Sequence, residues 1–289
     1  MQDVVAELLE LLTLERLEDN LFRGISRDIG TRYVFGGQVL GQALSAAQQT
    51  VAPERIAHSL HAYFLRAGDI EHPIVYDVDR ARDGKSFSVR RVVAIQHGQP
   101  VFNFSASFQE PEYGVEHQLP MPEVPDAGQV PEPAPLPAET MAQLPPKLQR
   151  WLSRKGPFEF RPVQARNELS PTRRPPVQQV WFRLADRIGA DMNQHRALLA
   201  YASDFHLIGT TTWPHGISYL QPNVQMASLD HAMWLHRPFR VDQWLLYACE
   251  SPSAQGARGL ARGSIYDRDG ALIASTAQEG LIRVIEPAK

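Results

Sequence analysis

Apolar residues follow two patterns along this chain, one helical and one alternating, and the order of the patterns occurs twice. Helical spacing predicts amphipathic helices over residues 3–19, 38–51 and 193–203. Runs rich in β-branched and aromatic residues predict strands over 21–26, 56–65, 74–81, 87–97, 100–109, 158–167, 177–185, 225–236, 244–250, 257–267 and 272–285. A long helix followed by consecutive strands, twice over, predicts an α+β fold in which each antiparallel sheet wraps its apolar face around a helix.

The two halves also match in sequence at nearly constant spacing. Two pairs of glycines lie 172 positions apart, and two pairs of polar residues lie 169 positions apart. The pairs are Gly84 with Gly256, Gly98 with Gly270, Ser59 with Ser228, and Gln109 with Gln278. Such offsets indicate a duplicated module with a small change of length, because unrelated strands would drift out of step. The function should therefore lie where the two copies differ.

Between the two copies the composition shifts to Pro, Glu and Ala, with prolines nearly alternating over residues 131–137. This composition is typical of a linker or a surface excursion. We therefore expect an N-terminal module over residues 1–112, a Pro-rich linker over 113–157, and a C-terminal module over 158–289 that carries the chemistry.

Composition and charge exclude several classes of function. The formal net charge is −3 and the pI is near 6.4, so no nucleic-acid partner is expected. The one cysteine, Cys249, lies in an apolar run and is predicted to be a small buried strand residue. No stretch has the 18 or so uninterrupted apolar residues that a membrane span requires. No membrane partner is expected, and the cytoplasm is the expected compartment.

The motifs that suggest cofactors or metals do not have the required spacing. Residues 36–41, GGQVLG, lack the G-x-G-x-x-G spacing of a dinucleotide loop and predict a helix start that approaches a neighbour closely. Anion binding by the N–H groups of that helix start is the alternative. His58 and His61 are three apart on a predicted strand and so point to opposite faces. With no cysteine cluster, H-E-x-x-H or G-x-S-x-G, we expect no metal, no cofactor and no serine nucleophile elbow.

Three polar residues of the second module are candidates for chemistry: Asp204, Ser228 and Gln278. Asp204 ends an apolar helix, where the helix dipole disfavours a carboxylate, and partial burial there would raise its pKa and make it a better base. An exposed helix-terminal Asp, a turn hydroxyl and an ordinary edge glutamine are the alternatives. Ser59 and Gln109 align with the last two candidates, whereas the first helix offers no carboxylate to match the first.

Segments spread over nearly the whole chain resemble the acyl-CoA thioesterase II family. They include VFGGQV (34–39), SLHAYFLR (59–66), DGKSF (83–87), LAYASD (199–204), DHAMWLHRPF (230–239) and ASTAQEG (274–280). The resemblance weakens only over the Pro-rich linker. It implies a double hotdog fold, with two tandem sheets each curled around a long helix, and hydrolysis of acyl-CoA thioesters of medium to long chain length to a free fatty acid and coenzyme A.

The resemblance also implies roles for the three candidates. The family's catalytic trio of aspartate, serine or threonine, and glutamine maps onto Asp204, Ser228 and Gln278. Bacterial members carry threonine where this chain has Ser228, which keeps the hydroxyl but has a less restricted rotamer. The implied mechanism has the trio hold one water, which Asp204 deprotonates for attack on the thioester carbonyl without a covalent intermediate. A homodimer or homotetramer is expected, because curved open sheets have edges to cover.

Two other functions remain open from the sequence. The first is a non-catalytic acyl-CoA binding protein, and the second is a hotdog enoyl-thioester hydratase. A hydratase needs an Asp–His pair on a short motif, and residues 204–206, DFH, have the residue types without that motif. Release of thiol from a saturated acyl-CoA distinguishes a thioesterase from both.

Overall fold

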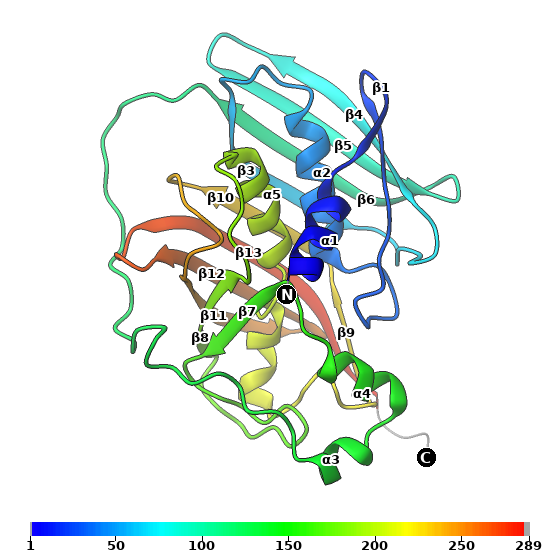
Figure 1. The fold of residues 1–289 in the computed structure, drawn as a ribbon, viewed down its shortest axis with the longest axis vertical. Coiled ribbons are helices and arrows are strands. Elements are labelled where there is room, and N and C mark those ends of the chain that lie inside the picture. Colours follow the sequence, from blue (N-terminus) through cyan, green and yellow to red (C-terminus); the bar gives the residue numbers. More distant parts are fainter. Residues whose placement is uncertain (1, 286–289) are drawn as a thin grey trace.

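The strands of both halves join in one antiparallel sheet that curves around two central helices (Figure 1). This computed structural model describes residues 2–285. The first half contains α1 (Gln2–Leu12), β1 (Glu15–Glu18), β2 (Leu21–Gly24), α2 (Gly36–Gln48), β3 (Ile56–Phe64), β4 (Ile74–Asp83), β5 (Phe87–Gln96) and β6 (Gln99–Gln109). The central segment contains α3 (Ala138–Ala142) and α4 (Pro146–Ser153). The second half contains β7 (Phe158–Pro162), β8 (Val177–Leu184), α5 (Met192–Ala202), the 3₁₀ helix η1 (Ile208–His215), β9 (Val224–Ser228), β10 (Asp230–Leu235), β11 (Leu245–Gln255), β12 (Arg258–Asp267) and β13 (Leu272–Val284).

The two halves meet at β3 and β10, which pair in antiparallel register through Leu60 with Met233. The strand order of the described chain is β1-β2-β4-β5-β6-β3-β10-β13-β12-β11-β8-β7, and β9 also pairs with β13. Each half thus repeats the same order of strands outward from the shared centre. The predicted α+β architecture, with antiparallel strands around long helices, is confirmed.

The central helices α2 and α5 pack directly against each other because α2 has glycines at the contact. A Cβ added to Gly41 would lie 3.0 Å from the carbonyl oxygen of Ala197, and one on Gly37 would collide with the carbonyl oxygen of Tyr201. Helix α2 has no charged residue and is buried over most of its length. The small residues of this helix therefore serve a close approach, as its sequence predicts, and the start of α2 meets the end of α5.

The first helix is shorter than its hydrophobic spacing predicts. It ends at Leu12, and residues 15–18 form the exposed strand β1 against β2 instead of continuing the predicted helix to residue 19. Leu14 still enters the core, whereas Leu17 is 40% exposed. Helical spacing over these residues is thus misleading, because their backbone N–H and C=O groups form hydrogen bonds with β2 instead of within a longer helix.

The ladder register shows which residues of the two halves correspond. In the first half Ala94 pairs with Phe102, and in the second Ile265 pairs with Ala274. A register shift follows at the next residue in both hairpins. When these bulges are aligned, each residue of β6 corresponds to the residue of β13 that lies 172 positions later in the sequence. The buried positions of the two strands then coincide.

This register corrects the pairing that the sequence repeat suggests for two candidate residues. Gln278 corresponds to the buried Ala106, and the outer position of Gln109 is not its counterpart. Ser228 pairs with Gly280 as Ala57 pairs with Phe108, so Ser228 corresponds to Ala57 and not to Ser59. The sequence pairing used an offset of 169 for both residues, whereas the ladders place the counterparts of Gln278 and Ser228 at offsets of 172 and 171. The first half thus has alanines where the second half has a hydroxyl and an amide.

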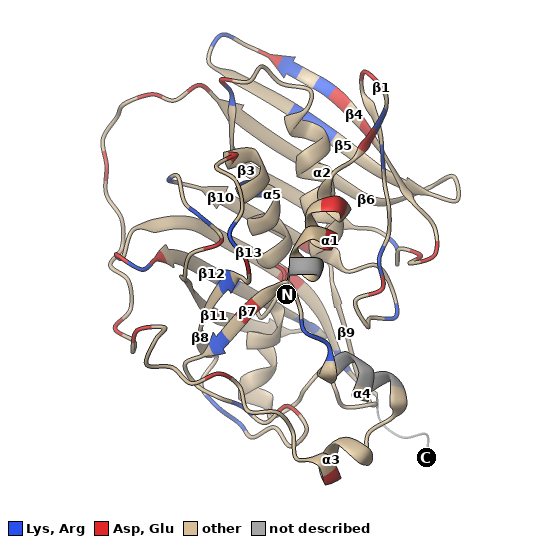
Figure 2. Cartoon of the chain, in the orientation of Figure 1, with Lys and Arg blue, Asp and Glu red and all other residues tan. Residues whose placement is uncertain are grey.

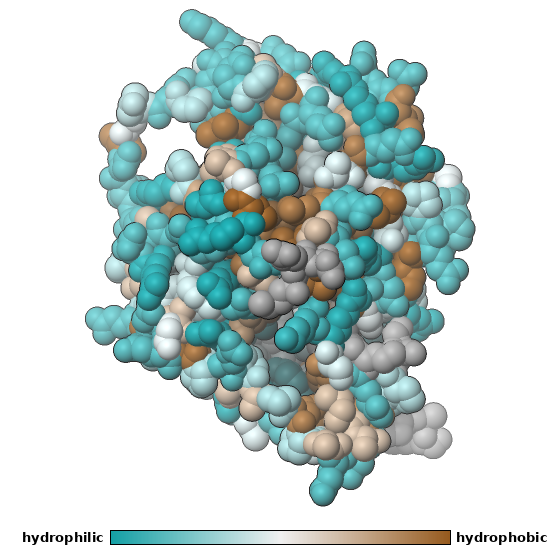
Figure 3. All heavy atoms as spheres, viewed as in Figure 1, coloured by the Kyte–Doolittle hydropathy of each residue, from teal (hydrophilic) through white to brown (hydrophobic). Residues whose placement is uncertain are grey.

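Charged residues of both signs are interspersed along the outer strands, for example on β4 (Figure 2). Figure 3 shows a mostly hydrophilic face with apolar side chains gathered where α1, α2 and α5 lie. Cys249 is buried on β11, as predicted, and burial raises the pKa of its thiol. No helix in the described range is long and apolar enough to cross a membrane.

Candidate active site

Asp204 lies where the end of α5 meets the start of α2. Helix α5 ends at Ala202 with Ser203 as its C-cap, so Asp204 is the next residue. The backbone N–H of Gly37 donates to the Asp204 carboxylate. A Cβ added to Gly36 would lie 2.7 Å from Oδ2 of Asp204. The close approach predicted for the glycine-rich helix start is therefore confirmed, and the group that the Gly37 N–H meets is the protein's own Asp204 carboxylate.

The structure brings all three predicted site residues together. Gln278 on β13 donates through Nε2 to Oδ1 of Asp204 at 2.6 Å and lies 3.2 Å from Oγ of Ser228. Ser228 ends β9, which pairs with β13 two residues beyond Gln278. The glutamine is fully buried and the other two side chains are partly buried. A carboxylate, a hydroxyl and an amide thus converge at one place on the second half.

Two helix ends act on the Asp204 carboxylate with opposite sign. It follows the negative end of the α5 dipole, but the positive end of α2 and the Gly37 N–H face it. Burial raises the pKa of Asp204 above its ordinary value, and the hydrogen bonds from Gln278 and Gly37 oppose that rise. The residue is therefore a carboxylate with strengthened basicity, and the alternative of an exposed helix-terminal Asp is wrong.

A fourth polar residue, His231 on β10, contacts the trio. Its Nδ1 lies 3.2 Å from Nε2 of Gln278, and its Nε2 lies 3.0 Å from Oγ of Ser203. Burial lowers the pKa of His231 to about 3, so the imidazole is neutral at physiological pH. Alternation with the buried Met233 and Leu235 is the sequence signal that places His231 on the inner face.

Aromatic side chains surround the carboxylate on its apolar side. The Phe35 ring is 4.5 Å from the ring of Phe205 and 5.2 Å from that of Tyr201, centroid to centroid. A Cβ on Gly36 would also touch Phe64, at 2.9 Å. Phe35, Phe64 and Phe205 are only partly buried. Apolar surface is therefore available beside the base.

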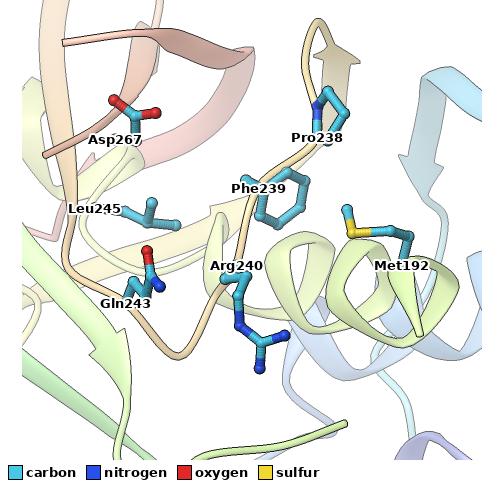
Figure 4. A pocket seen from close by; sticks show the side chains of 7 residues that line it. All are labelled: Met192, Pro238, Phe239, Arg240, Gln243, Leu245 and Asp267. Atoms are coloured by element: carbon cyan, nitrogen blue, oxygen red, sulfur yellow. The ribbon is translucent and has the colours of Figure 1, made fainter. Parts of the chain in front are cut away.

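The pocket in Figure 4 lies at the other end of α5 and includes none of the three predicted site residues. Its lining comprises Met192, Pro238, Phe239, Arg240, Gln243, Leu245 and Asp267. Met192 begins the helix, whereas Asp204 follows its last turn. Arg240 in this pocket is paired with Asp242 at 2.6 Å. This hollow is therefore separate from the converging polar residues.

One group of metal-ligating types occurs in the described range, on the surface of the first half. His72 Nδ1 and His97 Nε2 lie 2.7 Å and 3.0 Å from the same oxygen of Asp69. A backbone hydrogen bond from Glu71 and contacts with both histidines lower the pKa of Asp69 to about 2. His58 and His61 do not converge, since His58 bonds to Ser107 and His61 packs against Trp234. The expectation of no metal cofactor stays a prediction.

A sheet curved around two central helices, with a basic carboxylate, a hydroxyl and an amide where the helices meet, defines a hotdog-fold thioesterase. The chain belongs to the acyl-CoA thioesterase II family. An acyl-CoA thioesterase family model matches residues 151–281, and an acyl-CoA thioesterase N-terminal domain model matches residues 26–109.

Similar proteins cover the chain from end to end. Acyl-CoA thioesterase 2 of Haemophilus influenzae is 45% identical over 99% of this chain and 100% of its own length. Acyl-coenzyme A thioesterase 8 of Homo sapiens is 43% identical over 95% of this chain and 88% of its own. The structure of an acyl-CoA thioesterase II, TesB2, from Mycobacterium marinum matches with a TM-score of 0.77 and 40% identity, covering 95% of this chain and 97% of that one. This chain is accordingly an enzyme that hydrolyses acyl-CoA thioesters.

Proposed function

We propose that Asp204, Ser228 and Gln278 form the catalytic trio and act on a water molecule. The observation that supports this most directly is the 2.6 Å hydrogen bond from Gln278 to the partly buried carboxylate of Asp204, whose pKa is raised. A base must be held in one orientation and have a pKa raised toward the working pH. Asp204 has both properties, and the hydroxyl of Ser228 lies near enough to share a hydrogen-bonded water with it.

In the proposed reaction, Asp204 removes a proton from the water as the water oxygen bonds to the thioester carbonyl carbon. The carbon–sulfur bond then breaks, and the proton held by Asp204 passes to the departing thiolate of coenzyme A. The products are a free fatty acid and coenzyme A, and Asp204 returns to its ionised form. No covalent acyl-enzyme forms, so positioning and base catalysis supply most of the rate.

The proposed substrates are acyl-CoA thioesters of medium to long chain length, with broad tolerance. The partly buried rings of Phe35, Phe64 and Phe205 support this, because an apolar chain next to the thioester would bury against them. The test is thiol release from saturated acyl-CoA substrates of increasing length. A rate that rises from short to medium chains and then levels supports the proposal. A maximum at the shortest acyl group, or no thiol release at any length, contradicts it.

Ser228 is expected to act through its hydroxyl. Ser228→Ala should lower kcat about 10-fold, because one hydrogen bond to the reacting water is lost. Ser228→Thr should keep activity within about 3-fold of the wild type, since it restores the hydroxyl and restricts its rotamer. Steady-state kinetics with one saturated acyl-CoA measures both. Equal activity of all three proteins would show that the hydroxyl takes no part.

The remaining proposals concern organisation. We propose modules over residues 1–112 and 158–289 joined by the segment 113–157, and assembly as a homodimer or homotetramer. Exposed aromatic side chains support the assembly, since Tyr63 on β3 and Trp234 on β10 lie on the outer face at the centre of the sheet, 62% and 37% exposed. Light scattering on the purified protein measures the mass, and a monomer would overturn this part. The cytoplasmic location stays a prediction.

A further inference from the structure

The amide nitrogen of Gln278 has fewer hydrogens than it has acceptor atoms around it. Its Nε2 carries two hydrogens and lies within 3.2 Å of Asp204 Oδ1, Ser228 Oγ and His231 Nδ1. Its Oε1 is buried without a hydrogen-bond partner in the described range. The two ends of an amide are nearly the same size, so packing alone does not fix which end faces Asp204.

The orientation of this amide decides how the base behaves. With Nε2 toward Asp204, an N–H stabilises the carboxylate. With the amide turned over, Oε1 would face Oδ1 of Asp204 at hydrogen-bond distance, and two acceptors would repel unless the carboxyl were protonated. A group that favours the first orientation therefore keeps Asp204 ionised at lower pH.

His231 has the proton arrangement that favours the first orientation. The hydroxyl of Ser203 donates to the carbonyl oxygen of Ala200 at 2.9 Å, so its Oγ can only accept from His231 Nε2 at 3.0 Å. The proton of the neutral imidazole is thus held on Nε2. Its Nδ1 is left as an acceptor, and it faces Nε2 of Gln278. Only the amide orientation that also points an N–H at Asp204 satisfies this acceptor.

We propose that His231 is a positioning residue that fixes the amide of Gln278 through the chain Ala200–Ser203–His231–Gln278–Asp204. This inference rests on the proposed catalytic role of Asp204. His231 acts on Asp204 through Gln278, whose Nε2 donates to His231 Nδ1 and to Asp204 Oδ1. This role adds a residue of β10, a strand at the centre of the sheet, to the active site.

Other titratable groups lie near this chain of hydrogen bonds, and each is the same in the wild type and in the variants. Burial raises the pKa of Tyr201 on α5 and of Tyr247 on β11, so both stay neutral. Burial lowers the pKa of His206 to about 4. Asp230 on β10 accepts from the backbone N–H of Glu279 at 2.7 Å, and burial raises its pKa. Because these groups are unchanged in the variants, a difference between the acid limb of a variant and that of the wild type reports on Asp204.

His231→Leu should lower kcat about 10-fold or more with little change in KM, because Gln278 loses its orientation and Asp204 loses an N–H. That hydrogen bond lowers the pKa of Asp204, so its loss should move the acid limb of the kcat profile to higher pH. His231→Asn offers an acceptor oxygen near the place of Nδ1 and should restore the wild-type acid limb and most of the rate. A merely structural histidine would change stability without moving the acid limb.

Ser203→Ala is the second variant and decides the question if His231→Leu does not fold. Without Oγ the imidazole can move its proton to Nδ1, which favours the turned amide, so the acid limb should again move to higher pH. An acid limb that stays in place in every folded variant would overturn the inference. Wild type and Asp204→Asn are assayed beside them. Full activity of Asp204→Asn would overturn the proposed base. If Asp204→Asn is inactive and the acid limb of the His231 variants stays at its wild-type pH, this inference alone is overturned.

Discussion

Asp204→Asn is expected to lose activity and gain stability in the same protein. We expect kcat to fall about 10³-fold, within the range that a general base contributes, because asparagine cannot take a proton from water. The oxygen of the new amide can still accept from Gln278 Nε2, so the geometry of the site should remain. Thiol release from a saturated acyl-CoA measures the loss.

The gain in stability follows from the direction of the pKa shift. Burial raises the pKa of Asp204, so the folded protein binds this proton more tightly than the unfolded chain does. The ionised side chain therefore costs folding free energy, and the cost appears as pH rises from the unfolded toward the folded pKa. The neutral asparagine avoids that cost, so its Tm should exceed that of the wild type at neutral pH by about 2 °C or more. The difference should vanish below about pH 4, the ordinary Asp range.

Asp269→Asn is the matched control, since Asp269 is exposed in the β12–β13 turn of the same half. It should leave both kcat and the pH dependence of Tm unchanged. Equal effects of the two variants would mean that loss of any negative charge explains the result. If Asp204→Asn still hydrolyses a saturated acyl-CoA at the wild-type rate, the base is a residue other than Asp204.

The sequence predicts the architecture better than the contacts that make Asp204 a base. Strand alternation and helical spacing place most elements, because burial on one face is a local property of the sequence. The first helix is overestimated because its spacing continues into β1, where strand pairing decides the structure. The meeting of α2 with Asp204 is a tertiary contact of residues far apart in the chain. No local pattern reports that the positive end of one helix faces the residue after another.

The duplicated module is visible in the sequence, but its register is not. Matching Gln109 with Gln278 changes the offset from the 172 of the glycine pairs to 169, whereas the strand ladder keeps 172 and makes the buried Ala106 the counterpart of Gln278. For His231, the sequence predicts the direction of the side chain but not its partner. Its alternation with Met233 predicts an inward side chain, but its partner lies 47 residues away on β13. Because both counterparts of the polar pair are alanines, the first half retains none of the trio's hydroxyl and amide chemistry.

Gln278→Glu is expected to disable the enzyme by placing a second carboxyl against the first. The new oxygen would lie where Nε2 now lies, 2.6 Å from Oδ1 of Asp204. Two carboxylates at that distance do not both ionise, so the pair should share one proton at neutral pH. We expect kcat to fall about 10³-fold at neutral pH, because the shared proton occupies the base. The acid limb should move to higher pH, where the last proton leaves the pair.

The same variant should have a stability that depends on pH in a known direction. The second ionisation of the pair has a pKa above that of either acid in the unfolded chain, so the folded state again holds a proton more tightly. Stability should be close to that of the wild type at low pH and should fall as pH rises through the raised pKa. Melting curves across pH measure this. Gln278→Leu removes the same hydrogen bonds without adding a carboxyl, so it should show only the smaller slope of one raised carboxyl, that of Asp204.

Gln109→Glu separates the buried position from the one that the sequence repeat paired with it. Gln109 ends β6 on the outer side, where its side-chain amide donates to the exposed Glu112 at 3.4 Å. A carboxylate there faces solvent and should change neither the rate nor the slope of Tm with pH. If Gln278→Glu behaved like Gln109→Glu, the carboxylate of Asp204 would not be close to residue 278 in solution, and Asp204 would lack the hydrogen bond on which its proposed role rests. A large loss of kcat confined to Gln278→Glu would instead show that the buried amide of Gln278 keeps Asp204 unprotonated and able to act as a base.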